Sequence, residues 1–373
     1  MLLLGQRRIG KTYELKRLSD EIEISKYFDF EDGRNQKLFI PSVKDLEQIL
    51  GGSEVTGIVL FDEIQYLEKS GSILKLLYDH FPNLKVVATG SASFLMMKNI
   101  GDSLYGRYFA FYIFPLTMRE IIEEIEITDF SIGGFTQKYH KPKIDASLET
   151  QLIFGSLPEV FEMTDLSRKK EILQNYINNL LFKDIFEIER IQHPRIFKNL
   201  LQLLAFQIGK IVNPNELSKT LGIDRKTVLE YIYLYEKFHL IKTLSPFYKN
   251  PNKEIKKSFK VYFTDLGIRN GVIDDFKLLS LRGDRGELFE NYVVNMFKAN
   301  IHYLSLPYKI SFWRNFKQAE VDLILENTNT GKLNPIEIKW NKNKMPSRAF
   351  RNQYEDQIEQ EYCVNKENLW KYI

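Results

Sequence analysis

The chain has 373 residues, which is too long for one small domain, and its hydrophobic share of 44% is ample for packed cores. Lysine and arginine number 52 against 49 aspartates and glutamates, so the net charge of +3 excludes a polybasic coat but leaves room for local basic faces. The one cysteine, Cys363, excludes an internal disulfide and a cysteine-based zinc site. It fits a reducing cytoplasm, and because no apolar stretch approaches the length of a membrane span, we expect a cytoplasmic protein without a membrane partner.

A glycine-rich segment follows the first apolar run, Met1–Leu4. It matches the complete phosphate-binding pattern G-x-x-x-x-G-K-[ST], in which backbone N–H groups converge on phosphate oxygens and glycines keep side chains out of the way. Lys11 can reach the β and γ phosphates, and the Thr12 hydroxyl can hold Mg²⁺ at the start of a helix whose dipole favours anions. The segment therefore predicts a nucleotide-binding loop made of Gly5, Gln6, Arg7, Arg8, Ile9, Gly10, Lys11 and Thr12.

An apolar run that ends in two acids lies about fifty residues further along. Residues 57–61 are typical of a buried parallel strand, and Asp62 and Glu63 follow at its carboxyl end, where open α/β sheets bind ligands. Asp62 could hold Mg²⁺, and Glu63 could orient or deprotonate the attacking water. The alternative is a strand that ends in two solvated acids, and the glycine loop upstream favours the functional interpretation.

Two further candidates follow the next strand-like run, residues 84–89. Ser91, in the cluster Gly90-Ser91-Ala92-Ser93, could position the lytic water, although turn chemistry explains the same residues equally well. Arg107 precedes another strand-like run, residues 108–114, and could stabilise charge on a transferring phosphate. A surface arginine paired with a carboxylate is an equally good interpretation of Arg107.

Strands and helices alternate through the first third of the chain, which predicts a parallel sheet covered by helices. Gly133-Gly134 marks a loop, and residues 144–208 turn helical, with a stripe formed by Leu173, Tyr176, Ile177 and Leu180. The simplest role for this region is a lid over the nucleotide or a connector. The expected strands are residues 2–4, 27–30, 58–61, 85–88 and 108–114, and the expected helices begin at Lys11 or cover residues 43–50 and 73–81.

The order GQRRIGKT, VLFDEIQYL, VVATGSAS and LYGRYFAFYIFPLTMREI resembles the AAA-type core of a large group of bacterial and archaeal ATPases. In that group the core is followed by the domain DUF4143. The later phrase Gly155-Ser156-Leu157-Pro158-Glu159-Val160 is also similar, although the group more often has a Gly-Gly pair before the proline.

This resemblance implies ATP binding by Lys11, Thr12, Asp62 and Glu63, with Ser91 as a sensor residue and Arg107 as the arginine of the group. Related chains usually carry a segment before the first strand that helps to grip the adenine, whereas this chain begins four residues before the loop. We therefore expect either that the start of the chain is misassigned or that the adenine base of the nucleotide is held loosely.

Residues 213–265 are typical of a winged helix. A short amphipathic helix over 215–223 contains a turn-forming Gly222, and Asp224 can cap a second helix that runs from Arg225 to Phe238. Two strand-like runs, 240–244 and 259–264, would enclose a wing between them. The buried face of the second helix is expected to carry Val228, Leu229, Ile232 and Tyr235.

In a DNA-bound form, Arg225, Lys226 and Thr227 at the start of the second helix would face bases or phosphates. A local excess of positive charge around the wing suits phosphate neutralisation. It comes from Lys242, Lys249, Lys253, Lys256, Lys257 and Lys260 against Glu254. The alternative is a dimerisation or docking module that binds no nucleic acid.

The last hundred residues contain a helix, residues 286–294, and two strands, residues 320–325 and 335–340, joined by a polar turn. Period-two alternation places Val321, Leu323 and Leu325 on one face of the first strand and Asp322 on the other. On the second strand Glu337 and Lys339 oppose Ile336, Ile338 and Trp340. We therefore expect the acids and the lysine to meet on one side of a hairpin, together with Glu290 from the helix.

This arrangement is similar to the PD-(D/E)XK nuclease fold, in which carboxylates hold Mg²⁺ and a lysine orients or activates water. By that resemblance Asp322, Glu337 and Glu290 match the metal ligands, and Lys339 matches the lysine. Two alternatives remain open. One is an exposed Glu–Lys ladder on an edge hairpin, and the other is a degenerate fold that is kept for DNA binding and does not cut.

We therefore expect an α/β protein with four parts: a P-loop AAA-type ATPase core at 1–130, a helical lid or connector at 131–208, a winged helix at 209–272 and a small PD-(D/E)XK-like DUF4143 domain at 273–373. The predicted function is binding and hydrolysis of ATP with Mg²⁺, which drives a winged helix and a nuclease-like domain that act on DNA. The alternative is a nucleotide-dependent switch or adaptor whose carboxyl-terminal half docks a protein and whose nuclease fold is inactive. A homo-oligomer is compatible with both of these functions. A third possibility, a simple DNA-binding regulator, would leave the ATP-binding loop without a role.

Overall fold

The computed structural model describes residues 1–22, 26–91, 106–124, 135–181, 185–186, 191–247 and 259–372. The contacts divide the chain into two compact units, Met1–Phe114 with Lys237–His239, and Pro115–Glu236 with Leu240–Ile373. No helix in the described part of the chain combines the length and apolar character that a membrane crossing needs.

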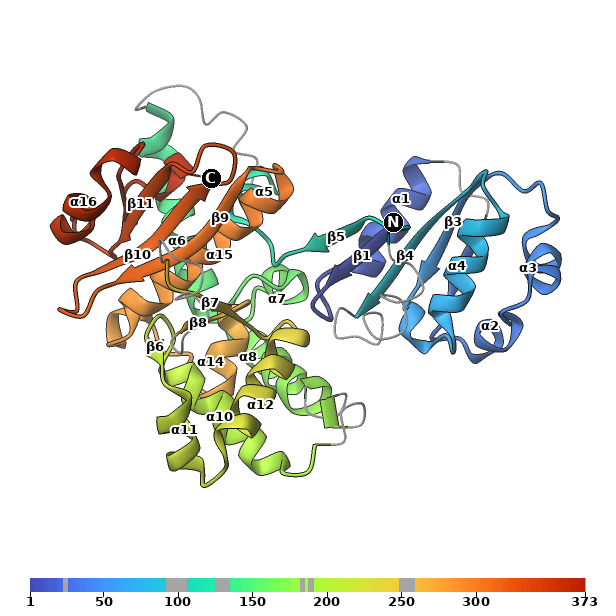
Figure 1. Cartoon of the computed structure of the whole chain (residues 1–373), viewed down its shortest axis with the longest axis horizontal. Helices are drawn as coiled ribbons and strands as arrows, with labels where there is room; N and C mark the ends of the chain where they lie inside the picture. The colour runs from blue at the N-terminus through green and yellow to red at the C-terminus, as the bar shows by residue number, and fades with distance from the viewer. Residues whose placement is uncertain are drawn as a thin grey trace. The chain divides into compact units, whose positions relative to one another are not determined.

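Unit 1 is built on a parallel five-stranded sheet (Figure 1), which confirms the sheet predicted from the alternating pattern. The strand order is β2-β3-β4-β1-β5. The first strand, β1, therefore lies inside the sheet, and the next strand, β2, lies at one edge of it. Such a reversal of strand order opens a crevice at the carboxyl ends of the strands. The strands are β1 (Leu2–Gly5), β2 (Lys26–Asp29), β3 (Gly57–Asp62), β4 (Leu84–Ser91) and β5 (Ala110–Ile113).

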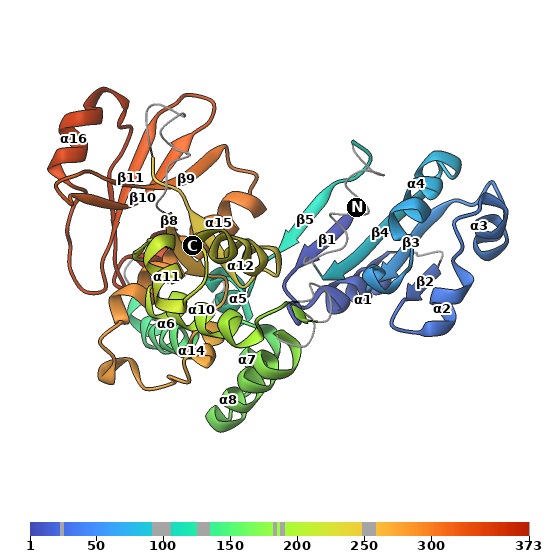
Figure 2. The ribbon, with the colours of Figure 1, turned by 60° about the horizontal axis from the view of Figure 1, so that its bottom comes forward.

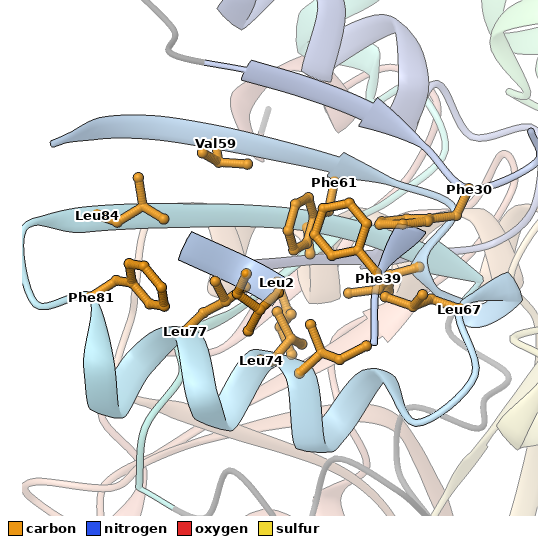
Figure 3. Packing of buried hydrophobic residues seen from close by; sticks show 14 of the residues in the cluster. Leu2, Phe30, Phe39, Val59, Phe61, Leu67, Leu74, Leu77, Phe81 and Leu84 are labelled. Carbon is orange, nitrogen blue, oxygen red and sulfur yellow. The ribbon is translucent and has the colours of Figure 1, made fainter. Parts of the chain in front are cut away.

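Both faces of this sheet are buried, as its continuous apolar strands require. One face carries Leu2, Val59 and Phe61, which pack with residues of the helices α3 and α4 and with Phe30 and Phe39 in the larger core (Figure 3). The opposite face carries Leu3 and Leu60, which pack against Leu15 of α1. The helical elements are α1 (Lys11–Glu21), α2 (Gly33–Leu38), α3 (Val43–Leu50), the short η1 (Ile64–Tyr66) and α4 (Ser70–His80).

The first part of unit 2 is helical, in agreement with the pattern seen over residues 144–208. Leu173, Tyr176 and Ile177 of the expected stripe are buried. The side chain of Leu180 and the Gly133-Gly134 loop lie outside the described residues. The helices are α5 (Met118–Glu124), α6 (Phe135–Phe154), α7 (Pro158–Glu162), α8 (Leu166–Asn175), the π-helical η3 (Tyr176–Leu181), α10 (Pro194–Phe206) and α14 (Leu266–Val272).

A small antiparallel sheet with the order β6-β8-β7 accompanies two of the expected helices. Asp224 accepts the Thr227 N–H at 2.9 Å and so caps α12, as predicted, and Val228, Ile232 and Tyr235 are buried on its inner face. Residues 248–258, with most of the expected wing lysines, lie outside the described part. The elements are β6 (Ile211–Val212), α11 (Pro214–Leu221), α12 (Arg225–Lys237), β7 (Ile241–Leu244) and β8 (Phe259–Phe263).

The carboxyl-terminal part of unit 2 is a four-stranded sheet with the order β12-β11-β10-β9. Phe350 and Tyr354 of α16 pack with Trp313 of β9 and with Val321 and Ile324 of β10, so α16 covers one face of the sheet (Figure 2). The helices are η4 (Leu279–Leu281), α15 (Arg285–Tyr303), α16 (Arg348–Tyr354), η5 (Glu355–Gln357) and η6 (Leu369–Tyr372). The strands are β9 (Tyr308–Arg314), β10 (Glu320–Asn327), β11 (Leu333–Ile338) and β12 (Tyr362–Val364).

The strict alternation expected along β10 is wrong at one place. The register with β9 shifts between Val321 and Ile324, so the β10 segment that contains Asp322 has one residue more than the strand opposite. Because of this bulge, Val321 and Ile324 reach the same core although they are three positions apart. A bulge bends a strand and redirects a side chain, and the chain places Asp322 in it.

A buried carboxylate, Asp265, joins the turn after α6 to the start of α14. It accepts the N–H of Ser156 at 2.6 Å and that of Ile268 at 3.0 Å, while burial raises the pKa of Asp265 to about 6. Gly155 lies against it with φ 77°, where an added Cβ would meet Asp265 Oδ1 at 2.1 Å. The position therefore needs glycine both for its backbone conformation and for space.

We expect Gly155→Ala to lower the free energy of unfolding by more than the ~1–2 kcal/mol that a left-handed conformation costs an L residue by itself. The matched control is Gly222→Ala, since Gly222 has a similar φ of 67° with nothing within 4 Å of the added Cβ. Urea denaturation of both variants measures the difference. Equal losses would show that Asp265 imposes no steric constraint at Gly155.

Candidate functional site

The phosphate-loop pattern forms a tight turn between β1, which ends at Gly5, and α1, which begins at Lys11. Gly10 and Arg8 adopt the left-handed region, with φ of 95° and 61°. A Cβ on Gly5 would lie 2.8 Å from the carbonyl oxygen of Ile113. Both glycines of the pattern are therefore required by the backbone path, and no side chain caps the first turn of α1, whose N–H groups can serve an anion.

Lys11 is held inside this turn. Its side chain is buried, and Nζ donates to the carbonyl oxygens of Gln6 at 3.0 Å and Gly5 at 3.4 Å. Burial lowers the pKa of Lys11, while the carboxylates of Glu63 and Asp62 act in the opposite direction. A cation satisfied only by carbonyl groups has capacity for a stronger, anionic partner.

Asp62 is the centre of the site. Its carboxylate is only 1% exposed, and Oδ1 accepts the Thr12 hydroxyl at 3.3 Å and the N–H of Glu63 at 3.1 Å. Oδ2 accepts the Tyr27 hydroxyl at 2.9 Å, and the Thr89 hydroxyl also donates to Oδ1. The structure thus brings together Thr12 and Asp62, as the sequence predicted, with the hydroxyl and carboxylate oxygens that suit a small divalent cation.

Sequence reasoning missed Tyr27 and Thr89. Tyr27 lies on β2 and Thr89 on β4, the two strands that flank β3 in the sheet. Period-two alternation places Thr89 on the same face as Val87, and both Tyr27 and Val87 pack at the core that contains Leu60. The alternation of residues along β2 and β4 shows which side chains share a face. It identifies Tyr27 and Thr89 as neighbours of Asp62 only once the strand order is known.

Glu63 leaves β3 with a φ of 52°, a conformation that non-glycine residues adopt at a cost of ~1–2 kcal/mol. Its N–H donates to Thr89 Oγ1 at 3.0 Å, and the Gln65 amide donates to its carboxylate. Burial and the nearby carboxylates of Glu63 and Asp29 raise the pKa of Glu31. Strained residues of this kind cluster at functional sites. The Glu63 carboxylate lies near other acids at this edge of the sheet, among them Glu31.

The role expected of Arg107, in its own subunit or across an interface, stays a prediction, and within the chain Arg107 pairs with a carboxylate. Arg107 Nε pairs with Asp79 Oδ1 at 3.2 Å, and the guanidinium lies 5.8 Å from the centre of the Tyr78 ring. Asp79 is near the end of α4, just before the amino end of β4, and Arg107 itself precedes β5. Since all five strands are parallel, Arg107 lies at the edge opposite the loop, and the ion pair with Asp79 holds it there.

The backbone of Ser91, in contrast, reaches the expected edge. Ser91 is the last residue of β4 and pairs with Gly5 in the register of β1, so it ends its strand beside the start of the loop. Its side chain lies outside the described part of the structure.

A second cluster lines a cleft of about 510 Å³ in the carboxyl-terminal part of unit 2. Lys339 Nζ contacts Asp322 Oδ2 at 2.8 Å and Glu337 Oε1 at 3.0 Å, and Asp322 also accepts the N–H of Ile338 at 2.8 Å. Lys344 Nζ adds a second contact to Glu337 Oε1, at 2.9 Å. The structure therefore brings together three of the four residues predicted for the nuclease-like site.

The fourth residue, Glu290, lies near enough to Asp322 for that carboxylate to raise its pKa, but its hydrogen bonds go to other partners. Its Oε1 accepts the Tyr262 hydroxyl at 2.7 Å and the Lys260 ammonium at 2.9 Å, and Lys260 also binds Glu320 at 2.6 Å. Burial raises the pKa of Glu290 to about 7, against the opposing effect of Lys260. Lys260 was expected to neutralise phosphate around the wing, but it is buried and committed to these two acids.

The expected metal triad of Glu290, Asp322 and Glu337 is therefore not assembled. Across the described ranges, no three histidine, cysteine or carboxylate side chains come together so that they could hold a metal ion. Each of these acids instead contacts a lysine, which is Lys260 at Glu290, Lys339 at Asp322, and Lys344 at Glu337.

Three families match consecutive parts of the chain. Residues 1–122 match an AAA domain, residues 145–278 match the domain of unknown function DUF8612, and residues 285–369 match the domain of unknown function DUF4143. The AAA match contains the loop and the acids at the end of β3. The DUF4143 match contains α15 and the sheet that carries the cleft.

Relatives of this chain include an uncharacterized protein of Methanocaldococcus jannaschii, 30% identical over 78% of this chain. The chain spans 65% of the length of that relative. An uncharacterized protein of Mycobacterium tuberculosis is 23% identical over 94% of this chain and 72% of its own.

Among solved structures, a Walker-type ATPase of Pyrococcus abyssi is similar with a TM-score of 0.46 and 18% identity, over 73% of this chain and 90% of that one. The ORC1 protein of Aeropyrum pernix, solved in complex with DNA, has a TM-score of 0.32 and 14% identity, over 74% and 86% of the two chains. The family matches, together with the loop and the sheet described above, establish that the chain carries an AAA domain in its amino-terminal part and DUF4143 in its carboxyl-terminal part.

Proposed function

We propose that this chain binds ATP with Mg²⁺ in the loop of residues 5–12 and hydrolyses it. The observation that carries the proposal is the contact of 3.3 Å between the Thr12 hydroxyl and the Asp62 carboxylate at the end of β3, beside a loop that holds a buried lysine. A match to an AAA domain over the same residues supports the same conclusion.

The roles of the residues follow from their positions. The N–H groups of the loop and of the first turn of α1 bind phosphate oxygens, and the helix dipole favours that negative charge. Lys11 exchanges the carbonyl oxygens of Gln6 and Gly5 for phosphate oxygens, because a charge-assisted hydrogen bond is about twice as strong as a neutral one. Thr12 and Asp62 would hold the magnesium ion, which neutralises charge on the phosphates when it is bound.

Glu63 is the proposed general base. It follows Asp62 directly, and its carboxylate is oriented by the Gln65 amide while its N–H is fixed by Thr89. A carboxylate in this position orients a water for attack and accepts its proton. Tyr27 and Thr89 are positioning residues, since they act through Asp62.

Substitution of Lys11 and of Glu63 separates binding from turnover. We expect Lys11→Ala to lose ATP binding measured by calorimetry, because the loop loses its only buried cation near the phosphates. We expect Glu63→Gln to bind ATP normally and to turn it over at least ~100-fold more slowly. Lys16→Ala is the matched control, since Lys16 is an exposed lysine on the same helix. Unchanged turnover in Glu63→Gln would remove Glu63 from its proposed role.

A conservative change at Tyr27 tests how Asp62 is held. Tyr27→Phe removes one hydrogen bond to a charged group, an interaction worth about 1.5–3 kcal/mol. We expect the Mg²⁺ concentration for half-maximal ATP turnover to rise about tenfold, while ATP binding in the presence of EDTA stays unchanged. Tyr13→Phe is the control, because Tyr13 is 69% exposed on α1. An equal loss of binding with and without Mg²⁺ would contradict a role through Asp62.

We also propose that unit 2 engages nucleic acid and that its state depends on the nucleotide. The order α10, β6, α11, α12, β7, β8, with a three-stranded antiparallel sheet, supports a winged helix. Arg225 and Lys226 are exposed at the amino end of α12, the position from which such helices contact DNA. The alternative is that the same elements dock a protein, and in that case Arg225 and Lys226 have no role in binding.

We propose further that the DUF4143 domain holds nucleic acid without cutting it. In support, no group of three histidine, cysteine or carboxylate side chains in the described residues could hold a metal ion, and Lys344 adds a second cation at Glu337. The retained but non-cutting fold, one of the alternatives drawn from the sequence, is the one that these contacts favour.

We expect wild-type ATP turnover to rise on addition of DNA, and charge reversal at Arg225 and Lys226 to abolish that rise without changing the basal rate. Turnover is measured with single-stranded, duplex and branched DNA in Mg²⁺, and again in Mn²⁺ with the DNA products separated on a gel. No product strand shorter than the input is expected. Cleavage that disappears in Asp322→Ala would refute the non-cutting assignment, and ATP-dependent capture of a protein that DNA does not affect would favour the docking alternative.

A further inference from the structure

The cleft of the DUF4143 domain has one strongly basic wall. Residues 338–354 contain five cations and no carboxylate, and they are Lys339, Lys342, Lys344, Arg348 and Arg351. Lys339, Lys344 and the run from Met345 to Arg348 line the cleft. An acid-free basic segment beside a cleft suits a polyanion.

Ion pairs take up part of this charge, since Lys339 and Lys344 pair with Asp322 and Glu337, and Arg351 pairs with Glu361. Glu320 contacts Lys260 at 2.6 Å and Arg314 at 3.5 Å, and Asp322 contacts Lys339 at 2.8 Å. Arg348 and Lys342, in contrast, form no ion pair with any carboxylate that the structure describes. An approaching anion therefore meets a rim with uncompensated positive charge.

One polar atom in the wall of the cleft has no partner. Glu337 is 2% exposed, and its Oε1 receives Lys339 and Lys344, but its Oε2 is buried without a hydrogen bond. A buried acceptor without a donor costs about 1–3 kcal/mol.

An exposed aromatic residue, Phe316, lies two positions before residues that line the cleft. The turn from β9 to β10 presents Phe316 fully exposed, at 109% of the reference exposure. The turn is fixed by hydrogen bonds from Asn315 N to Ala319 O at 3.0 Å and from Gln318 N to Asn315 O at 3.1 Å. Gln318 and Ala319 of the same turn line the cleft, so Phe316 belongs to a hydrogen-bonded turn that borders it.

We propose that this cleft binds a single-stranded nucleic acid, with one base stacked on Phe316 and the backbone phosphates at Lys342 and Arg348. Aromatic platforms beside basic grooves recognise single strands because an unpaired base offers its face, whereas the faces of bases in a duplex are covered by stacking. This inference rests on the proposed engagement of nucleic acid by unit 2, and it names the site and the form of the strand.

The test uses the full chain and a fluorescently labelled 12-nucleotide oligo(dT), read by anisotropy. We expect Phe316→Ala to weaken binding about 5- to 100-fold, the range that loss of one stacked base gives, and Phe316→Trp to retain it. Phe206→Ala is the matched control, since Phe206 is 61% exposed on α10 and does not line the cleft, and it should bind as wild type does. Arg348→Gln should lower the slope of log K against log salt concentration by about 0.7, the value for one phosphate of a single strand.

A hairpin duplex and an oligo(U) of the same length complete the experiment. Weaker binding of the duplex than of oligo(dT) supports the inference. The tighter binder of oligo(dT) and oligo(U) shows whether the cleft prefers DNA or RNA. Equal affinity of Phe316→Ala and wild type would overturn the site. So would oligonucleotide binding that is lost on charge reversal at Arg225 but kept in Phe316→Ala, because α12 would then carry it. ATP turnover of the wild type without nucleic acid decides the proposed hydrolysis separately.

Discussion

The proposed nucleotide site depends on the hydrogen bonds of one buried carboxylate at the edge of a parallel sheet. Asp62 is almost without solvent, and it accepts hydrogen bonds from hydroxyl groups of α1, β2 and β4 and from a backbone N–H. These donors converge because β2, β3 and β4 pair in one register, with Asp29 opposite Asp62 and Ala88 opposite Phe61. A slip of one residue would turn the donors to the other face, so strand pairing and the chemistry of the loop are set by the same contacts.

In unit 2, the carboxylates Glu290 and Asp322 are each paired with a lysine. Lys260 is buried between Glu290 and Glu320, and Lys339 lies between Asp322 and Glu337. Breaking such a buried pair leaves an uncompensated charge, at ~3–5 kcal/mol for removal of one partner. These acids of unit 2 are thereby paired with lysines, in contrast to the neutral donors around Asp62.

The sequence was sufficient where the signal is contiguous. The loop of residues 5–12, the strand that ends in Asp62 and Glu63, and the helix capped by Asp224 all depend on neighbours within a few positions, and the structure has them where the patterns indicated. Tyr27, Thr89 and the Lys260–Glu290 pair were missed because each requires two segments to be paired first. The bulge in β10 was missed for a related reason, since the extra residue is defined only against the register of β9.

The different partners of these carboxylates explain why the two sites suit different ligands. The hydrogen-bond donors to Asp62 are neutral hydroxyl and amide groups, so its negative charge remains available to a cation. Asp322 and Glu337 have ammonium groups within 3.0 Å, so a divalent cation would have to displace a lysine that is already paired. Once these acids are neutral as pairs, the remaining charge of the cleft comes from Lys342 and Arg348 and is positive. These contacts are the reason that we propose Mg²⁺ with a triphosphate for the first site and the backbone of a nucleic acid for the second.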